Sequence, residues 1–250
     1  MKRLLKAISE SKHLVALTGA GISTLSGVSD FRGKNGLYKQ DSIDADKIFS
    51  LPYFMKDPSY YYLNTKNFIY NVHEKTPCIV HRVLAKLEKR NILKSVTTQN
   101  IDMLHQKAGS RNVIEIHGSP EIHRCLKCRK SFTYAEICKI LNDGFIPECP
   151  DCGGTVKPEI IFFGENLNEQ ALDNAVSEAS KADLMLVLGS TLVVQPAASL
   201  PLYTLKHGGR IVIINNMETP LDDMAFLCYN DLEETFSFLE KTLLASAEGA

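Results

Sequence analysis

Four cysteines are the residues whose types and spacing most clearly indicate chemistry. Cys125 and Cys128 form one close pair, and Cys149 and Cys152 form a second pair 20 residues further along the chain. Two such pairs can meet at one tetrahedral centre, and this spacing is typical of a four-thiolate zinc site. Four protein ligands leave no open position for substrate, so we expect a structural zinc. The alternative is a set of buried thiols or a redox pair.

A glycine turn is the second candidate. Gly19-Ala20-Gly21 follows an apolar run, and such a turn lets backbone N–H groups approach a phosphate near the start of a helix. By itself the motif is weak, because the third glycine of the usual dinucleotide fingerprint is missing. Asp41 lies about 20 residues on, but it does not end an apolar strand, and a plain tight turn remains an alternative.

Polar residues also follow several apolar runs. Gln99, Asn100 and Asp102 follow one run, and His117 ends another just before a glycine. These groups suit a ribose and a carboxamide, and a histidine here can titrate near neutrality as a general base should. Most lone histidines are structural, but His117 has the context of a functional one.

These groups must be positioned by a sheet and its helices. Short β-branched runs predict buried strands, and helical periodicity between them predicts a doubly wound parallel sheet, an α/β fold resembling the Rossmann type. The expected strands are 14–17, 96–98, 113–116, 160–163, 184–188 and 211–214. The expected helices are 1–12, 79–90, 169–182, 196–206 and 232–245.

Two segments interrupt this alternation. We expect a helical insertion at 34–75 and a zinc-binding module at 119–157 to form a smaller lobe, leaving 1–33, 76–118 and 158–250 as the Rossmann-like domain. Ligands usually bind between such lobes, at the carboxyl ends of parallel strands.

Composition excludes several classes of protein. The 250 residues are 44% apolar and carry a net charge of −1, which rules out a disordered tail and disfavours direct nucleic-acid binding. No apolar run is long enough for a signal peptide or a membrane span. Seven cysteines suit a reducing compartment, so we expect a soluble, cytoplasmic protein without a membrane partner.

The motifs together resemble those of the sirtuins, the NAD-dependent protein deacylases. The matching stretches occur in the family's order between about Leu14 and Asn230, and they include the four cysteines. The others are Gly19–Ser23, Asp30–Gly33, Thr98–Asp102, His117–Gly118, Phe162–Glu165, Gly189–Ser190 and Asn215.

The resemblance implies a role for each matching residue. His117 and Asn100 would be catalytic. Residues that would bind NAD are Ala20, Gly21, Thr24, Phe31, Arg32, Gln99, Asn100, Ile101, Asp102, Ser190, Thr191, Asn215 and Asn216. Residues that would contact an extended acyl-lysine peptide are Ile160, Phe162, Gly164, Glu165 and Val193. Such a peptide would add as a strand between two edges.

The resemblance also implies the reaction. The acyl oxygen of lysine would attack C1′ of the NAD ribose as nicotinamide leaves, and His117 would then take a proton from a ribose hydroxyl. Water would complete the release of free lysine and O-acyl-ADP-ribose. No arginine occurs between Gly33 and His81, where family members that remove acidic acyl groups carry one, so acetyl or longer apolar groups are favoured.

One departure and three alternatives remain open. Ser29 stands where the family usually has proline, which leaves the NAD loop less restricted. The same NAD pocket would also serve a protein mono-ADP-ribosyltransferase. A hydride-transfer dehydrogenase and a zinc-ribbon binding module are further alternatives. The sequence leaves the oligomeric state and the protein substrates undetermined.

Overall fold

A parallel sheet forms the larger part of the molecule. The computed structural model describes residues 1–28 and 44–244. Within them, six strands form the main sheet, in the spatial order β3 (Val113–Glu115), β2 (Leu93–Thr98), β1 (Leu14–Thr18), β7 (Leu184–Leu188), β8 (Arg210–Ile214) and β9 (Leu227–Tyr229). All adjacent pairs are parallel. Numbered along the chain this order is 3-2-1-4-5-6, so the predicted doubly wound fold is confirmed.

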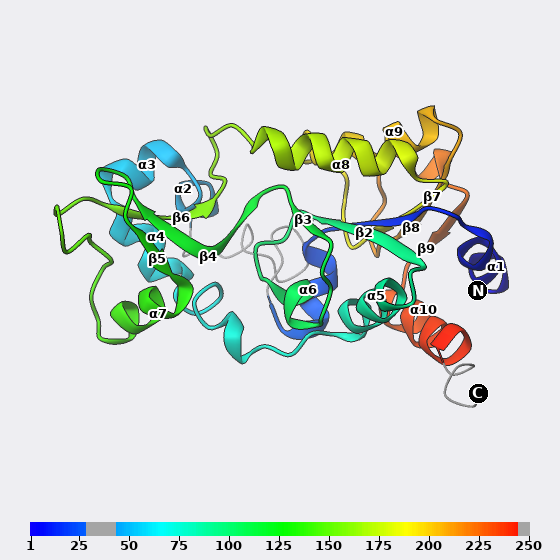
Figure 1. Cartoon of the computed structure of the whole chain (residues 1–250), viewed down its shortest axis with the longest axis horizontal. Helices are drawn as coiled ribbons and strands as arrows, with labels where there is room; N and C mark the ends of the chain where they lie inside the picture. Colours follow the sequence, from blue (N-terminus) through cyan, green and yellow to red (C-terminus); the bar gives the residue numbers. More distant parts are fainter. Residues whose placement is uncertain (29–43, 245–250) are drawn as a thin grey trace.

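Helices cover both faces of this sheet (Figure 1). One face carries α1 (Lys2–Glu10), α5 (Ile79–Lys89) and α10 (Leu232–Leu239), and the other carries α8 (Glu169–Lys181) and α9 (Leu200–Lys206). Side chains alternate between the two cores along each strand: Leu14 and Ala16 belong to the first, Val15 and Leu17 to the second. Burial on both sides explains why these strands are continuous apolar runs.

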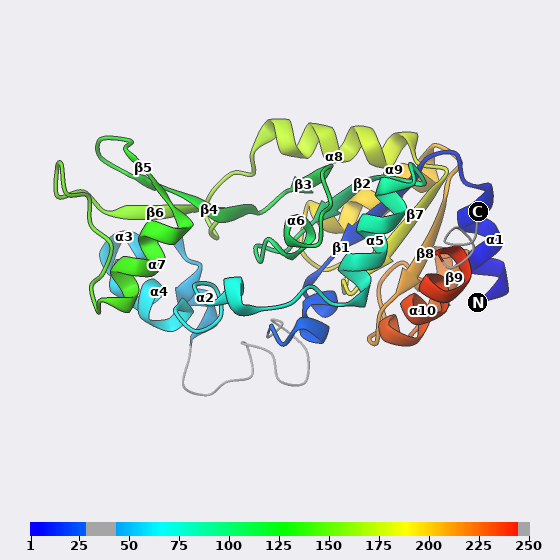
Figure 2. The same ribbon diagram turned by 60° about the horizontal axis from the view of Figure 1, so that its bottom comes forward.

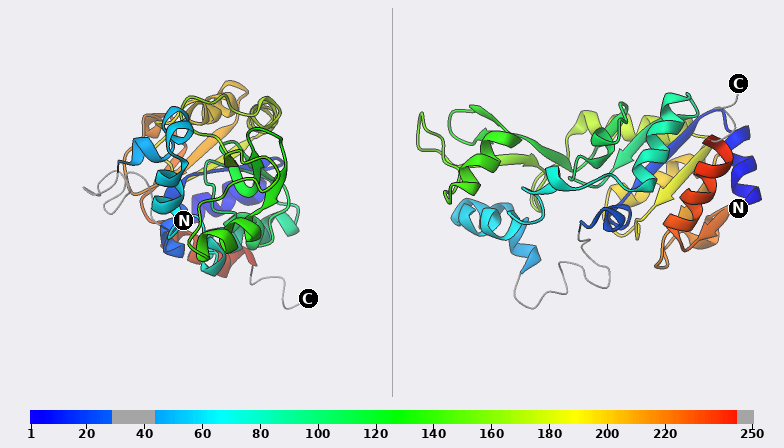
Figure 3. Two further views of the ribbon diagram at one scale, coloured as in Figure 1. Left: turned by 90° about the vertical axis from the view of Figure 1, so that its left-hand side faces the viewer. Right: turned by 90° about the horizontal axis from the view of Figure 1, so that it is seen from below.

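The smaller lobe lies at the other end of the long axis (Figures 2 and 3). Its antiparallel sheet has the order β5 (Ser131–Thr133), β4 (Gly118–Cys125) and β6 (Val156–Ile160). Its helices are α2 (Ala45–Ile48), α3 (Leu51–Lys56), α4 (Pro58–Thr65) and α7 (Tyr134–Asn142). An aromatic core that includes Phe54, Tyr61 and Phe162 joins the helices to the sheet.

Short helices complete the described chain. They are η1 (Ala20–Ser26), η3 (Val72–Glu74), α6 (Leu104–Lys107), η4 (Ala197–Ser199), η5 (Asp222–Met224) and the π-helical turn η6 (Glu240–Leu244). Side-chain caps fix several helix starts: the Thr133 hydroxyl accepts from the Glu136 N–H, and the Glu136 carboxylate accepts from the Thr133 N–H, as in a capping box. No helix in the described ranges is both long and apolar enough to cross a membrane.

One predicted strand is in the wrong place. The run 160–163 was expected in the main sheet, but the strand is β6, which ends at Ile160 and pairs antiparallel with β4. The run is apolar because Ile160 and Phe162 pack into the aromatic core of the small lobe. The expected domain boundary at 158 therefore falls inside a strand of the small sheet.

Candidate active site

A cavity of about 760 Å³ opens at the carboxyl ends of the main strands. It lies where the strand order reverses between β1 and β7, which is where doubly wound sheets bind their ligands. Its volume is in the range of small-molecule sites. Predicted site residues that line it are Ala20, Gly21, Thr24, Gln99, Asn100, Ile101, His117, Ile160, Ser190, Thr191, Val193, Asn215 and Asn216.

Two glycines, Gly21 and Gly189, bring the ends of β1 and β7 into direct backbone contact. The Gly21 N–H donates to the carbonyl oxygen of Gly189 at 2.9 Å. A Cβ atom on Gly21 would lie 2.8 Å from Gly189 Cα, and one on Gly189 would lie 2.5 Å from the nitrogen of Ile22. Gly189 also has φ of +60°, a conformation that L side chains rarely adopt. The glycine turn therefore packs its backbone closely against β7 at the cavity, which a plain tight turn does not require.

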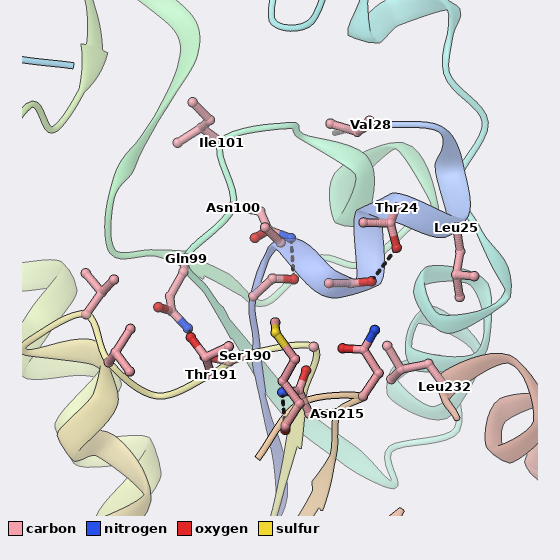
Figure 4. A pocket seen from close by; sticks show the side chains of 18 of the residues that line it. Thr24, Leu25, Val28, Gln99, Asn100, Ile101, Ser190, Thr191, Asn215 and Leu232 are labelled. Atoms are coloured by element: carbon pink, nitrogen blue, oxygen red, sulfur yellow. Dashed lines mark hydrogen bonds between the residues drawn. The ribbon is translucent and has the colours of Figure 1, made fainter. Parts of the chain in front are cut away.

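Amides and hydroxyls form a network on the wall formed by β1, β2 and β7 (Figure 4). The Gln99 amide donates to Ser190 Oγ at 2.9 Å. The Asn100 amide donates to the Gly19 carbonyl oxygen and to Ser23 Oγ, both at 3.1 Å. Because these bonds fix both amides, their remaining polar atoms are held in defined positions at the cavity.

Asp102 lies behind this wall. Its carboxylate accepts from Ser23 Oγ at 2.5 Å and from the Leu104 N–H at 2.9 Å. Burial raises the pKa of Asp102, and the Ser23 hydrogen bond opposes that shift. Asp102 is not among the residues that line the cavity, so in this structure it supports Ser23 and, through it, Asn100.

His117 follows β3 and is half-buried at the cavity. Its Nδ1 atom lies 3.0 Å from the carbonyl oxygen of Gln99. A carbonyl oxygen can only accept, so the proton is on Nδ1 and Nε2 keeps its lone pair. Burial lowers the pKa of His117, and the Gln99 hydrogen bond partly opposes it. A neutral imidazole is therefore favoured at neutral pH, as a general base requires.

The end of β6 and the segment after it form one edge of the cavity. Ile160, Ile161 and Phe163 line it, and Val193 and Val194 line the edge after β7. Phe162 and Phe163 point in opposite directions, with 1% and 53% of their surfaces exposed. Phe162 lies in the aromatic core, so any peptide contact it makes would come from its backbone.

Two other expected peptide residues lie outside the cavity lining. These are Gly164 and Glu165. The Glu165 carboxylate instead accepts from the Phe162 N–H at 2.7 Å and pairs with Lys157. Phe31 and Arg32, expected at the NAD ribose and nicotinamide, fall outside the described residues.

Several lining residues have no predicted role. They are Leu25, Gly27, Val28, Phe49, Met217 and the four residues from Asn230 to Glu233 at the start of α10. The sequence could have indicated that a helix starts at the last group, since Asp231 precedes an amphipathic segment. Asp231 does cap α10, by accepting from the Glu234 N–H at 2.8 Å. Phe49 reaches the cavity from the small lobe, and nothing local in its sequence indicates that.

The four paired cysteines converge at the tip of the small lobe. Their Sγ atoms all lie within 4.8 Å of one another. Zn–S bonds of about 2.3 Å in a tetrahedron separate the sulfurs by roughly 3.8 Å, so the cluster fits zinc. The Cys128 N–H donates to Cys125 Sγ and lowers the pKa of the Cys125 thiol, which favours the thiolate that metals bind. The cluster lies at the opposite end of β4 from His117, so it is structural.

The fold and cavity define the class of the protein: a doubly wound nucleotide-binding enzyme with a second lobe whose four clustered cysteines fit zinc. A model of the Sir2 family matches residues 19–196. The chain therefore belongs to the Sir2 family, the sirtuins.

Known proteins are similar to this one in sequence and structure along nearly the whole chain. The NAD-dependent protein deacetylase of Thermotoga maritima is 47% identical over 230 residues, covering 92% of each protein. A solved Sir2 structure with a deacetylated p53 peptide and 3′-O-acetyl ADP ribose has a TM-score of 0.91 at 45% identity, covering 96% of this chain and 97% of that one. Sir2Tm bound to a propionylated peptide has a TM-score of 0.87 at 42% identity, with coverage of 96% and 97%.

Proposed function

We propose that the protein is an NAD-dependent protein lysine deacylase that removes acetyl or other apolar acyl groups. The observation that carries the proposal is one cavity in which the neutral His117, the fixed amides and an apolar peptide edge lie together. The relatives named as NAD-dependent deacetylases and the structures with acylated peptides support the same activity. Acyl-lysine peptides are therefore the substrates.

The chain's own residues suit NAD as co-substrate. Hydroxyls from Thr24, Ser190 and Thr191 and amides from Gln99, Asn100, Asn215 and Asn216 line the cavity and offer neutral hydrogen bonds to ribose and phosphate oxygens. Closely packed glycines let backbone N–H groups approach the pyrophosphate. When bound, NAD supplies the electrophilic sugar carbon that accepts the acyl oxygen.

His117 would act as the general base. Its Nε2 lone pair takes a proton from a ribose hydroxyl, so that the hydroxyl oxygen can attack the carbon of the transferred acyl group. The Gln99 carbonyl holds the ring and stabilises the imidazolium that forms. Asn100, which lines the same cavity, would orient the reacting water or sugar, and this is the catalytic role we propose for it.

The peptide would bind between the segment after β6 and the segment after β7. Val193 and Phe163 are both more than half exposed, although both are large and apolar. An extended peptide that covers them would remove this surface from water and place its lysine in the cavity. Apolar walls also exclude water, which competes for the same sugar carbon.

The proposal also covers the compartment, the domain bounds and the partners of the protein. Four reduced thiolates suit a reducing compartment, and we propose that the protein is cytoplasmic. We also retain a Rossmann-like domain of residues 1–33, 76–118 and 158–250 and a small domain of residues 34–75 and 119–157, with β6 shared across the boundary at 158. We propose no nucleic-acid partner, since the net charge is −1.

Mass spectrometry of an acetylated peptide incubated with and without NAD tests the proposal. We expect NAD-dependent loss of the acetyl group, with equal amounts of nicotinamide and O-acetyl-ADP-ribose. ADP-ribose attached to protein, with the peptide still acetylated, would instead indicate a mono-ADP-ribosyltransferase. Formation of NADH would indicate a dehydrogenase.

A further inference from the structure

A largely buried ion pair closes the loop that follows β6. Lys157 and Glu165 are eight residues apart, and Lys157 Nζ lies 2.8 Å from Glu165 Oε2. Their side chains are 7% and 25% exposed, which is unusual for a lysine. Other described ion pairs of the small lobe, such as Lys130 with Asp151, are far more exposed.

Both charged groups also bind the backbone of the loop they enclose. Lys157 Nζ donates to the carbonyl oxygen of Ile160 at 2.7 Å and lies 4.1 Å from the centre of the Phe162 ring. Glu165 Oε2 accepts from the Phe162 N–H at 2.7 Å. The ammonium thus donates its hydrogen bonds within the loop, and the ion pair fixes the conformation of the residues between Lys157 and Glu165.

This loop contains the peptide edge of the cavity. Phe162 packs into the aromatic core with the ammonium over its ring, and the neighbouring Phe163 is exposed and lines the cavity. The Phe163 N–H donates to the Phe49 carbonyl oxygen at 2.7 Å, and the Ile161 N–H donates to the His117 carbonyl oxygen at 2.9 Å. The loop therefore connects the small lobe, the peptide edge and the histidine segment.

We propose that Lys157 and Glu165 are positioning residues that hold the 160–164 loop ready for the acyl peptide. The inference rests on the proposed function and reassigns Glu165 from contact with the peptide to support of the loop that contacts it. A loop that is already ordered loses less conformational entropy when the peptide binds. The pair therefore acts on peptide affinity, and the chemical step and NAD binding depend on it little.

Lys157→Met tests this directly, because it keeps the aliphatic stem and removes the ammonium. We expect KM for an acetylated peptide to rise about tenfold, with kcat changed less than about threefold and KM for NAD unchanged; a tenfold change corresponds to about 1.4 kcal/mol. Lys157→Arg should restore KM to within about threefold. A variant that only unfolds in part would instead lose kcat at constant KM.

Two further variants keep the test decisive. Lys130→Met removes an exposed lysine of the same lobe and should leave both KM values unchanged. If Lys157→Met loses zinc or melts at assay temperature, the double variant Lys157→Met/Glu165→Gln replaces it, since removing both charges leaves no unpaired buried ion. The double variant should show the same selective rise in peptide KM.

Direct peptide binding separates this inference from the proposed function. Fluorescence anisotropy gives the Kd of the acetylated peptide without turnover, and we expect the Lys157→Met value to be about tenfold weaker than wild type. An unchanged Kd in a folded, zinc-loaded variant, or an equal loss in Lys130→Met, overturns the positioning role even if the wild type deacylates. A wild type that binds the peptide without deacylating it overturns the proposed function alone.

Discussion

The imidazole of His117 donates its Nδ1 proton to the backbone carbonyl oxygen of Gln99 across 3.0 Å. The two residues follow β3 and β2, which are neighbours in the sheet. The carbonyl belongs to the backbone, so no side-chain motion releases it. This single bond orients the ring and leaves Nε2 as the basic atom at the cavity.

Replacing His117 by alanine removes that base. We expect kcat for deacetylation to fall by about 10²- to 10⁴-fold, the usual contribution of a general base. The melting temperature should change little, because the side chain is half-buried at a cavity and contributes little to either core. Steady-state kinetics and a melting curve check this, and turnover within a few-fold of wild type refutes the role.

The pH profile of kcat/KM reports the protonation of His117. Burial lowers the pKa of His117 below its ordinary value of 6.5, and only the neutral ring accepts a proton. Therefore kcat/KM should rise with pH through an apparent pKa below 6.5 and be level by pH 7. An acid limb centred above pH 7 contradicts the assignment.

Gly189→Ala tests the close packing of β1 and β7. The new Cβ would lie 2.5 Å from the Ile22 nitrogen and would push the glycine turn away from β7. We expect KM for NAD to rise at least about tenfold, or 1.4 kcal/mol. Gly109→Ala is the matched control, because Gly109 also has positive φ but no atom lies within 4 Å of its Cβ position. This variant should therefore be less stable, with KM for NAD unchanged. An equal KM in the two variants rejects the packing argument.

Cys128→Ala should release the zinc and unfold the small lobe. Structural zinc binding is worth about 10–16 kcal/mol in zinc-finger peptides, and that free energy is folding free energy. Zinc content by mass spectrometry and circular dichroism would measure the loss. Cys228→Ala, which removes an exposed thiol outside the cluster, should retain one zinc per chain. A zinc-free Cys128→Ala protein with full activity is the contrary result.

Three buried histidines make the free energy of unfolding depend on pH. Burial lowers the pKa of His81 to about 4 and those of His105 and His123 to about 3. Between pH 6 and 5 the unfolded chain binds protons at these sites and the native protein does not. Stability therefore falls as pH falls, whereas Glu115, whose pKa burial raises to about 7, opposes the trend. These four groups together contribute a slope on the order of 2 kcal/mol per pH unit.

Urea denaturation at pH 6 and pH 5 measures that slope. His123→Asn removes one of the three titrating groups, so its slope should be smaller by up to about 1.4 kcal/mol per pH unit. The substitution lowers stability at both pH values because His123 Nε2 bonds the Tyr70 hydroxyl at 2.8 Å, and the comparison is therefore of slopes. An unchanged slope would show that His123 binds a proton in the native protein as readily as in the unfolded chain, so that burial does not lower its pKa.

Acyl selectivity follows from the cavity wall. Among the described residues, the lining contains no lysine or arginine. A succinyl carboxylate would lose its hydration there without a cationic partner, so we expect turnover at least about tenfold slower than for acetyl- or propionyl-lysine. A panel of matched peptides measures this. Faster removal of succinyl than of acetyl would contradict the prediction.

The sequence predicted the parts of the fold that depend on local pattern. The doubly buried strands are continuous β-branched runs, and the cysteine pairs and glycine turn have fixed spacings, so each was predictable. The place of 160–163 was not, because an apolar run does not indicate which core it enters. Which of Phe162 and Phe163 faces the cavity depends on the register after β6 and on the aromatic core that Phe162 enters, and both are tertiary features.

A crystal structure with NAD and an acetylated peptide tests the central claim most directly. The account predicts the nicotinamide ribose beside Nε2 of His117, the pyrophosphate against the Gly19–Gly21 turn, and the peptide between Phe163 and Val193. NAD bound elsewhere, or His117 turned away from the sugar, would contradict it.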